Sequence, residues 1–325
     1  MCDPMNLVKL RFSMIGTIAL LIIVSTVFFA ILLSFFGVGN LFSLAFMVIL
    51  SNLAQWLFAP QMINSMYKVK EISKTEDSQI HDTVERLSQR IGLKMPKVMM
   101  ANMPIPNAFA YGSPIGGNRV AVTKGLLKNL QPEEVEAVLG HELGHLKNKD
   151  VQTMMFASAM PAIFYFLGSS MMSSAYRGGD RRRTGGAAPM MIGMGSMIAH
   201  YVLTLLTLHL SRVREYYADQ RSISIVDDGA RKLSEALAKI ASSSSKMRLH
   251  RQSKANLNSF KALFIEDPDS SERDEIAISG TKMFKTDQQL VQEILSRKVT
   301  AADHMMELMS THPNIVKRLK AMREQ

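Results

Sequence analysis

The feature that most constrains this chain is a long run near its N-terminus without a charged residue. The run extends from Phe12 to Tyr67. A helix needs roughly 20 apolar residues to cross the hydrocarbon core of a bilayer, so this run is long enough for two spans. A Gly-Val-Gly-Asn turn at 37–40 divides the run, which predicts membrane helices at about 14–36 and 41–63. The first is too long for a cleaved signal peptide.

Basic residues flank this first hairpin on both sides. Lys9 and Arg11 precede it and Lys68 and Lys70 follow it, whereas the turn between the spans has no Lys or Arg. Positively charged flanks stay on the cytoplasmic side of a membrane. We therefore expect a multi-pass protein of the cell membrane, with the domain after the hairpin facing the cytoplasm.

A second pair of apolar stretches occurs in the middle of the chain. Residues 153–175 and 184–211 are uncharged, and a basic segment at 177–183 joins them. We expect both stretches to span the membrane, although spanning places the basic segment outside, against the usual charge distribution. Partial insertion, or packing against the first hairpin, is the alternative. The predicted divisions are a membrane hairpin at 1–67, a cytosolic catalytic part at 68–152, a second hairpin at 153–211 and a cytosolic C-terminal catalytic part at 212–325.

The net charge of +10 raises the question of a nucleic-acid partner. No basic stripe with interleaved aromatic residues occurs, and the densest basic cluster, at 181–183, lies between two apolar stretches. Anionic lipid headgroups explain this charge better, so we expect a lipid bilayer and no nucleic acid as partner. The single cysteine, Cys2, excludes an intramolecular disulfide and a cysteine-based zinc finger.

The water-facing segments show mainly helical periodicity with a few short strands. The predicted fold class is therefore α+β, mainly α, with two transmembrane hairpins and a small β-sheet. Loops are expected at 242–245 and 266–275, which are rich in Ser and acidic residues. Helices are expected at 78–91, 132–149, 229–241, 250–264, 287–298 and 313–324, and strands at 96–100, 107–111 and 119–122.

A His-Glu-x-x-His motif lies inside the helix that is predicted to begin at Pro132. His141 and His145 are one turn apart on one face, which lets both imidazoles reach one Zn²⁺. Glu142 lies about 100° around the helix, where a general base can take a proton from the attacking water. An apolar stripe on the opposite side leaves the motif face free to line a cleft. The alternative is an ordinary helix with two surface histidines.

A catalytic zinc ion needs a third protein ligand and an open coordination position. Asn148 and Val151 stand where the metzincin continuation would need Gly and His. Glu215 and Asp219 are the candidates, because a spacing of four places them on one face of a later helix. One carboxylate can bind the metal while the other orients a ligand imidazole. The alternative is a helix whose carboxylates pair with neighbouring arginines.

Together these motifs resemble the HtpX family of membrane-bound zinc endopeptidases, gluzincins that are related to the CAAX prenyl protease. The resemblance rests on the motif at 141–145 followed by Asp150, and on Ser-Arg-x-Arg-Glu-Tyr-x-Ala-Asp at 211–219. It extends to Asn-Ala-Phe-Ala at 107–110 and to Thr-His-Pro at 311–313, and it covers nearly the whole chain. Residues 242–283 lie outside these motifs.

The resemblance implies a gluzincin-type zinc peptidase domain with one Zn²⁺ per chain. It implies that Glu215 is the third metal ligand. Asp219 is then the carboxylate that contacts a ligand imidazole and not the metal. It also implies a quality-control protease that cleaves damaged or misassembled membrane proteins, and we expect unfolded polypeptides as substrates too.

Two further residues are candidates for contacts with substrate. Asn107 and the strand that follows can hold a substrate backbone as an added strand, and the alternative is plain core sheet. His312 can donate to the oxyanion, and the alternative is a His that merely precedes Pro313 at the entry to a helix. Asp150 is expected at a helix end or beside a metal ligand.

The second hairpin separates the two halves of the predicted metal site. Only short segments join it to His145 and to Glu215, so we expect the metal near the cytosolic membrane surface and substrates presented from the bilayer. A prenyl-protein processing protease is one competing function, and it requires spans that enclose a large chamber. A zinc-stabilised membrane scaffold without turnover is the other, and the presence of Glu142 argues against it.

Overall fold

A computed structural model describes residues 67–177, 187–250 and 286–324, together with isolated positions between Leu20 and Ser65. The described residues form two compact units. The first lies within Leu57–Val151 and Ser211–Gln325, and the second contains Gln152–Leu210. Most of the predicted first hairpin (14–36 and 41–63), nearly all of the predicted helix at 250–264, the acidic loop at 266–275 and most of the basic segment at 177–183 lie outside the described residues.

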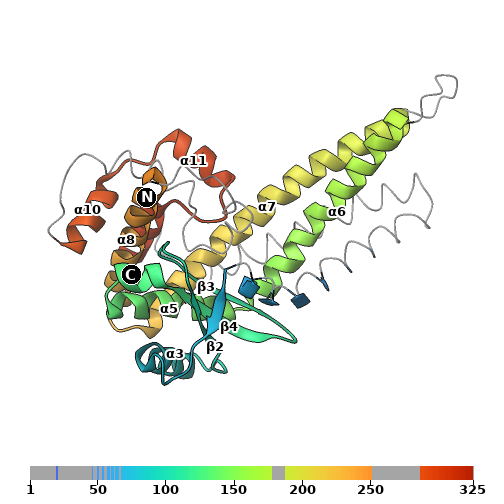
Figure 1. The fold of residues 1–325 in the computed structure, drawn as a ribbon. Coiled ribbons are helices and arrows are strands. Elements are labelled where there is room, and N and C mark those ends of the chain that lie inside the picture. Colours follow the sequence, from blue (N-terminus) through green and yellow to red (C-terminus); the bar gives the residue numbers. More distant parts are fainter. Residues whose placement is uncertain are drawn as a thin grey trace. The chain divides into compact units, whose positions relative to one another are not determined.

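The first unit is built on a four-stranded mixed sheet with the order β1-β2-β4-β3 (Figure 1). β2 and β4 are parallel, and the other two pairings are antiparallel. The three predicted strands are confirmed, whereas β1 was not predicted because three residues show no periodicity. Because β3 stands at the end of the strand order, it is an edge strand among the described residues. The strands are β1 (Val69–Glu71), β2 (Lys97–Ala101), β3 (Ala108–Ser113) and β4 (Gly117–Thr123).

Helices cover this sheet and form one hydrophobic core with it. The helices predicted at 78–91, 132–149, 287–298 and 313–324 are confirmed, with ends that differ by at most two residues. α4 and α11 were not predicted, because short helices carry little periodic signal. The helices are α3 (Ser78–Arg90), α4 (Lys124–Asn129), α5 (Pro132–Lys147), α8 (Gly229–His250), α10 (Asp287–Ser296), α11 (Ala301–Leu308) and α12 (Ile315–Arg323).

The prediction of a loop at 242–245 is wrong, because α8 continues through these serines to His250. Serine disfavours a helix interior only slightly. Ser243 Oγ also lies 3.0 Å from Asn129 Oδ1, a contact that fixes this turn of α8 against the end of α4.

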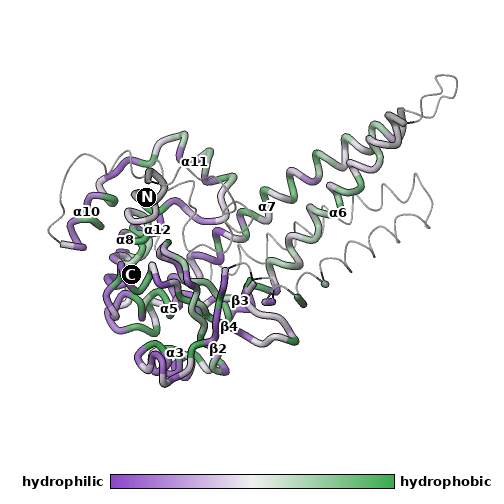
Figure 2. Tube along the Cα trace, in the orientation of Figure 1, coloured by the Kyte–Doolittle hydropathy of each residue, from purple (hydrophilic) through white to green (hydrophobic). Residues whose placement is uncertain are grey.

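The second unit contains the two apolar stretches of the middle of the chain. α6 (Asp150–Arg177) and α7 (Ala187–Ile225) include two segments, Asp150–Ser173 and Pro189–Ile225, that are long and apolar enough to cross a membrane. Apolar residues recur along both helices (Figure 2). Gly168 and Gly193 let the two backbones approach, since a Cβ on Gly193 would lie 3.3 Å from Gly168 O. α7 extends beyond the predicted end at 211 without a break.

The start of α4 supports the segment that leads into the edge strand β3. Thr123 Oγ1 accepts hydrogen bonds from the amides of Asn107 and Leu126, both at 3.0 Å. The amide of Gly125 donates to Met103 O at 2.9 Å. A Cβ on Gly125 would lie 2.1 Å from Pro104 O, a backbone atom that cannot rotate away.

We predict that Gly125→Ala lowers the free energy of unfolding by about 1–3 kcal/mol, the usual effect of overpacking. Thermal and urea unfolding of the detergent-solubilised chain would measure it. Lys124→Ala, an exposed neighbour on the same helix, is the matched control and should be near neutral. Equal stability of the two variants would contradict the packing described here.

Candidate metal centre and active site

Three side chains that the sequence predicts as metal ligands converge in the first unit. His141 Nε2 and His145 Nε2 are 3.1 Å apart. Glu215 Oε2 lies 3.5 Å from His141 Nε2, and Glu215 Oε1 lies 3.4 Å from His145 Nε2. Donors around a tetrahedral zinc ion with bonds of about 2.0–2.1 Å are about 3.3 Å apart. The three side chains therefore have the spacing of a metal-ligand set, and they offer one ligand atom each.

The hydrogen-bonding partners of the imidazoles strengthen this assignment. His141 Nδ1 lies 2.9 Å from Asp219 Oδ1, and His145 Nδ1 lies 2.6 Å from Asp150 Oδ2. Each carboxylate favours the tautomer with the proton on Nδ1. In that tautomer both Nε2 atoms can offer a lone pair to a cation bound between them. The chemistry of the donor set, two imidazoles and one carboxylate, fits zinc.

Close packing of α5 against α7 produces this convergence. A Cβ on Gly144 would lie 3.2 Å from Arg221 Cβ and 3.3 Å from Ala218 Cα. A Cβ on Gly140 would lie 3.0 Å from Ser222 Oγ. The two glycines, one turn apart on α5, thus let α7 approach until Glu215 reaches the histidines.

The same packing corrects one prediction. The motif face of α5 was expected to be free to line a cleft, but α7 packs against it, and His141 and Glu142 are only 1% and 4% exposed. The helix is buried nearly all round from Glu134 to Leu146.

Asp219 is held by an arginine that the sequence reasoning missed. Arg318 of α12 donates to both carboxylate oxygens of Asp219, from Nη2 at 2.6 Å and from Nε at 2.9 Å. Arg318 is 2% exposed and Asp219 is completely buried. A signal for this role existed, because Arg318 lies on the apolar face of its helix with Ile315 and Met322. An arginine in a core stripe needs an anionic partner.

A second arginine holds the carboxylate that orients His145. Arg214 Nε lies 3.1 Å from Asp150 Oδ1. Each ligand imidazole thus has a buried aspartate, and each aspartate has a buried arginine. The alternative in which Arg212 and Arg214 pair with Glu215 and Asp219 is not what the structure shows. Arg214 reaches Asp150, and Arg212 donates to main-chain carbonyls of residues 307–310.

Burial and charge shift the pKa values of these groups in opposite directions. Burial alone would lower the pKa of His145, but the carboxylates of Asp150 and Glu215 raise it to about 10. Burial would raise the pKa of Glu215, but His312, His141 and His145 hold it well below its usual value. Arg318 and His141 likewise keep the pKa of Asp219 low against the effect of burial. The lowered pKa values favour the ionised forms of Glu215 and Asp219.

Glu142 lies between the donor cluster and the edge strand. Burial raises the pKa of Glu142, and the amide of Ala110 donates a hydrogen bond that opposes the rise. Ala110 is the middle of β3, so the edge strand runs beside this carboxylate. Asn107 is buried immediately before β3, and its main chain is bonded to Thr123.

His312 contacts Glu215, the candidate for the third metal ligand. His312 Nδ1 lies 3.1 Å from Glu215 Oε2. His312 Nε2 is buried and has no hydrogen-bond partner among the described residues. The loop that carries His312 is fixed by a hydrogen bond from its amide to Ser310 Oγ at 3.1 Å.

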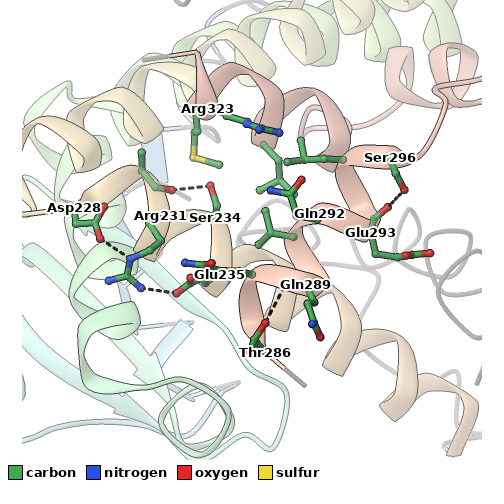
Figure 3. A pocket seen from close by; sticks show the side chains of 16 residues that line it. Asp228, Arg231, Ser234, Glu235, Thr286, Gln289, Gln292, Glu293, Ser296 and Arg323 are labelled. Atoms are coloured by element: carbon green, nitrogen blue, oxygen red, sulfur yellow. Dashed lines mark hydrogen bonds and ion pairs between the residues drawn. The ribbon is translucent and has the colours of Figure 1, made fainter. Parts of the chain in front are cut away.

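A pocket of about 1310 Å³ lies elsewhere, between α8, α10 and α12 (Figure 3). No residue of the donor cluster lines it. Its charged side chains are largely paired with one another, since Arg231 contacts both Asp228 and Glu235. The large pocket is therefore not the candidate active site.

Comparison with known proteins gives a consistent result. The model of peptidase family M48 matches residues 74–325. The protease HtpX homologue of Aeropyrum pernix is 37% identical over 287 residues, which cover 87% of this chain and 86% of that protein. The HtpX homologue of Thermoplasma acidophilum is 33% identical over 277 residues, 84% of this chain and 81% of that protein.

A solved structure is similar in fold. The crystal structure of Ste24p from S. mikatae superposes with a TM-score of 0.55 at 17% sequence identity, and it covers 97% of this chain and 67% of that chain. The mostly helical fold with a small mixed sheet is thus shared with a known structure. On the family match and the identity to two HtpX homologues, the chain belongs to peptidase family M48 and is a metalloendopeptidase.

Proposed function

We propose that the chain is a membrane-anchored zinc endopeptidase that cleaves damaged, misassembled or unfolded membrane proteins. In this proposal His141, His145 and Glu215 hold one zinc ion and Glu142 is the general base. One observation carries it: two imidazole Nε2 atoms and one carboxylate converge with the spacing of a tetrahedral site. The close approach of the two Nε2 atoms, 3.1 Å apart beside the Glu215 carboxylate, supports a cation at this point.

The zinc ion, when bound, would polarise the scissile carbonyl and lower the pKa of water. Glu142 would take the proton of the attacking water and pass it to the leaving amine. The raised pKa of Glu142 suits a group that must both accept and release a proton. Asp219 and Asp150 keep the Nδ1 proton on the two imidazoles, and Arg318 and Arg214 hold these carboxylates in place.

The substrate backbone would bind along β3. An edge strand offers main-chain groups that can pair with an added peptide strand. β3 pairs only with β4 among the described strands, and its Ala110 amide contacts Glu142. A peptide on this edge would therefore lie against the general base. Asn107 acts in this proposal by fixing the start of the edge strand through Thr123.

His312 would stabilise the oxyanion that develops on the scissile carbonyl. Its buried Nε2 is available to a bound substrate, while Nδ1 faces Glu215. Removing one preorganised donor of this kind typically costs about 10²- to 10³-fold in kcat.

The membrane part of the proposal rests on the apolar hairpins. We propose that 1–67 and 153–211 anchor the chain in the cell membrane, with 68–152 and 212–325 facing the cytoplasm. Exposed apolar side chains along the described hairpin, such as Phe166, Met191 and Ile198, are what a lipid-facing helix presents. Prenyl-protein processing and a scaffold without turnover are not favoured, the latter because Glu142 lies beside the donors.

Replacing the general base tests the chemistry. Glu142→Gln should retain bound zinc and the native fold. It should lower the rate of cleavage of an unfolded membrane protein by about 10²- to 10⁴-fold, because the proton acceptor is lost. Glu133→Gln, an exposed residue on the same helix, is the matched control and should retain activity. Undiminished cleavage by pure Glu142→Gln protein would remove Glu142 from the mechanism.

Metal removal tests the identity of the ion. Elemental analysis of the purified chain should give about one zinc per chain, and a chelator should abolish cleavage. Zn²⁺ should restore activity and Mg²⁺ should not, because imidazole donors favour zinc. A chain that is active with Mg²⁺ alone, or a Glu215→Gln variant that binds zinc as tightly as the parent, would contradict the proposed ligand set.

The arginine of α12 provides a third test. Arg318→Leu leaves Asp219 buried without its cation, which typically costs about 3–5 kcal/mol of stability. Arg318→Lys keeps the positive charge but loses the bidentate hydrogen bond to Asp219. It should increase the rate of zinc release to a chelator by about 10- to 100-fold. Lys320→Leu on the same helix is the control. Zinc release that is unchanged in Arg318→Lys would show that Arg318 does not position the ligand.

A further inference from the structure

α11 presents an apolar surface to solvent. Met305, Leu308 and Met309 are 74%, 54% and 66% exposed, and their spacing of three and four places them on one face. Ala301 and Ala302 extend this face toward the start of the helix and are also exposed. Single exposed apolar residues are ordinary, whereas a contiguous group marks an interaction surface.

Arg212 fixes the end of α11 to α7. Its Nη1 donates to Glu307 O at 2.7 Å, to Leu308 O at 3.2 Å and to Ser310 O at 2.8 Å. The last carbonyls of a helix lack partners within the helix, and a cation there also suits the helix dipole. Arg212 is only 8% exposed, so this contact is built into the fold.

The position of Arg212 in the chain decides what the apolar surface faces. Arg212 directly follows the uncharged stretch at 184–211, and α7 runs through both without a break. Where this stretch spans a bilayer, Arg212 marks the level at which α7 leaves the hydrocarbon. The carbonyl end of α11, held by Arg212, is then at the membrane surface.

We propose that α11 is an interfacial helix whose Met305, Leu308 and Met309 enter the boundary between lipid headgroups and acyl chains. This inference rests on the membrane anchoring proposed above. An amphipathic helix with an apolar face and basic neighbours binds such a boundary. Lys298 is exposed just before the helix and supplies the positive charge beside the face, whereas Lys317 Nζ is paired with Glu307 of α11 and also lies 3.0 Å from His304 Nδ1.

The proposed contact has a consequence for the active site. Met309 is followed by Ser310 and Thr311, and His312 then contacts Glu215. An α11 that rests on the bilayer would hold the His312 loop close to the lipid surface. Substrate segments that leave the bilayer would reach the metal centre with little exposure to water. A substrate protein is the competing occupant of the apolar face, and the arginine at the membrane boundary favours lipid.

Fluorescence quenching in lipid nanodiscs tests this inference without measuring activity. Cys2→Ser together with Glu142→Gln provides a cysteine-free background without self-cleavage. Met305→Cys and Leu308→Cys, made one at a time, would each carry an environment-sensitive fluorophore. Ile198→Cys on the apolar part of α7 is the control for a lipid-facing site, and Gln89→Cys on α3 is the exposed control.

Labels at 305 and 308 should emit at shorter wavelength than the label at 89. They should be quenched by spin-labelled phospholipid and protected from iodide, like the label at 198. Lipid quenching at 198 with iodide quenching at 305 and 308 would overturn the interfacial helix and leave the membrane anchoring intact. Protection at 305 and 308 that occurs only after unfolded casein is added would assign the face to substrate and also overturn the inference. Proteolysis by the parent chain is measured in a separate experiment, so that a failure of the proposed activity is distinguished from a failure of the interfacial helix.

Discussion

The structure depends on the meeting of two imidazole Nε2 atoms at the interface between α5 and α7. Carboxylates at both Nδ1 positions leave the two Nε2 lone pairs facing one point, 3.1 Å apart. A cation bound between these atoms would join α5 to α7 through both imidazoles and Glu215. The glycines at 140 and 144 give α7 its close approach, and that approach brings Glu215 to the same point.

The buried charges around this point explain why distant parts of the chain are needed. Unpaired buried carboxylates would be costly, and each aspartate that orients a ligand has an arginine of its own. Asp150 begins α6, Arg214 comes from α7 and Arg318 from α12, so together with α5 the metal centre joins four helices. His312 adds a fourth contact from the loop before α12. The C-terminal part is thus a structural component of the site.

Local patterns predicted much of this architecture. The lengths of the uncharged runs predicted α6 and α7, and helical spacing placed His141, Glu142 and His145 on one turn. Spacing alone left Glu215 and Asp219 interchangeable, because which carboxylate reaches the imidazoles depends on how α7 packs. Arg318 and Asp219 are far apart in the sequence, so no local pattern predicts their ion pair. The one signal in the sequence is that Arg318 lies on the apolar face of its helix. The burial of the motif face was mispredicted for the same reason: α7 covers it.

X-ray absorption at the zinc edge of the purified full-length chain tests the central claim most directly. The account predicts a first coordination shell of nitrogen and oxygen at about 2.0–2.1 Å, with the outer-atom scattering of two imidazoles. The scattering of both imidazoles should persist in Glu142→Gln, and that of one should be lost in His145→Ala. A spectrum with one imidazole or none in the parent chain would contradict the account.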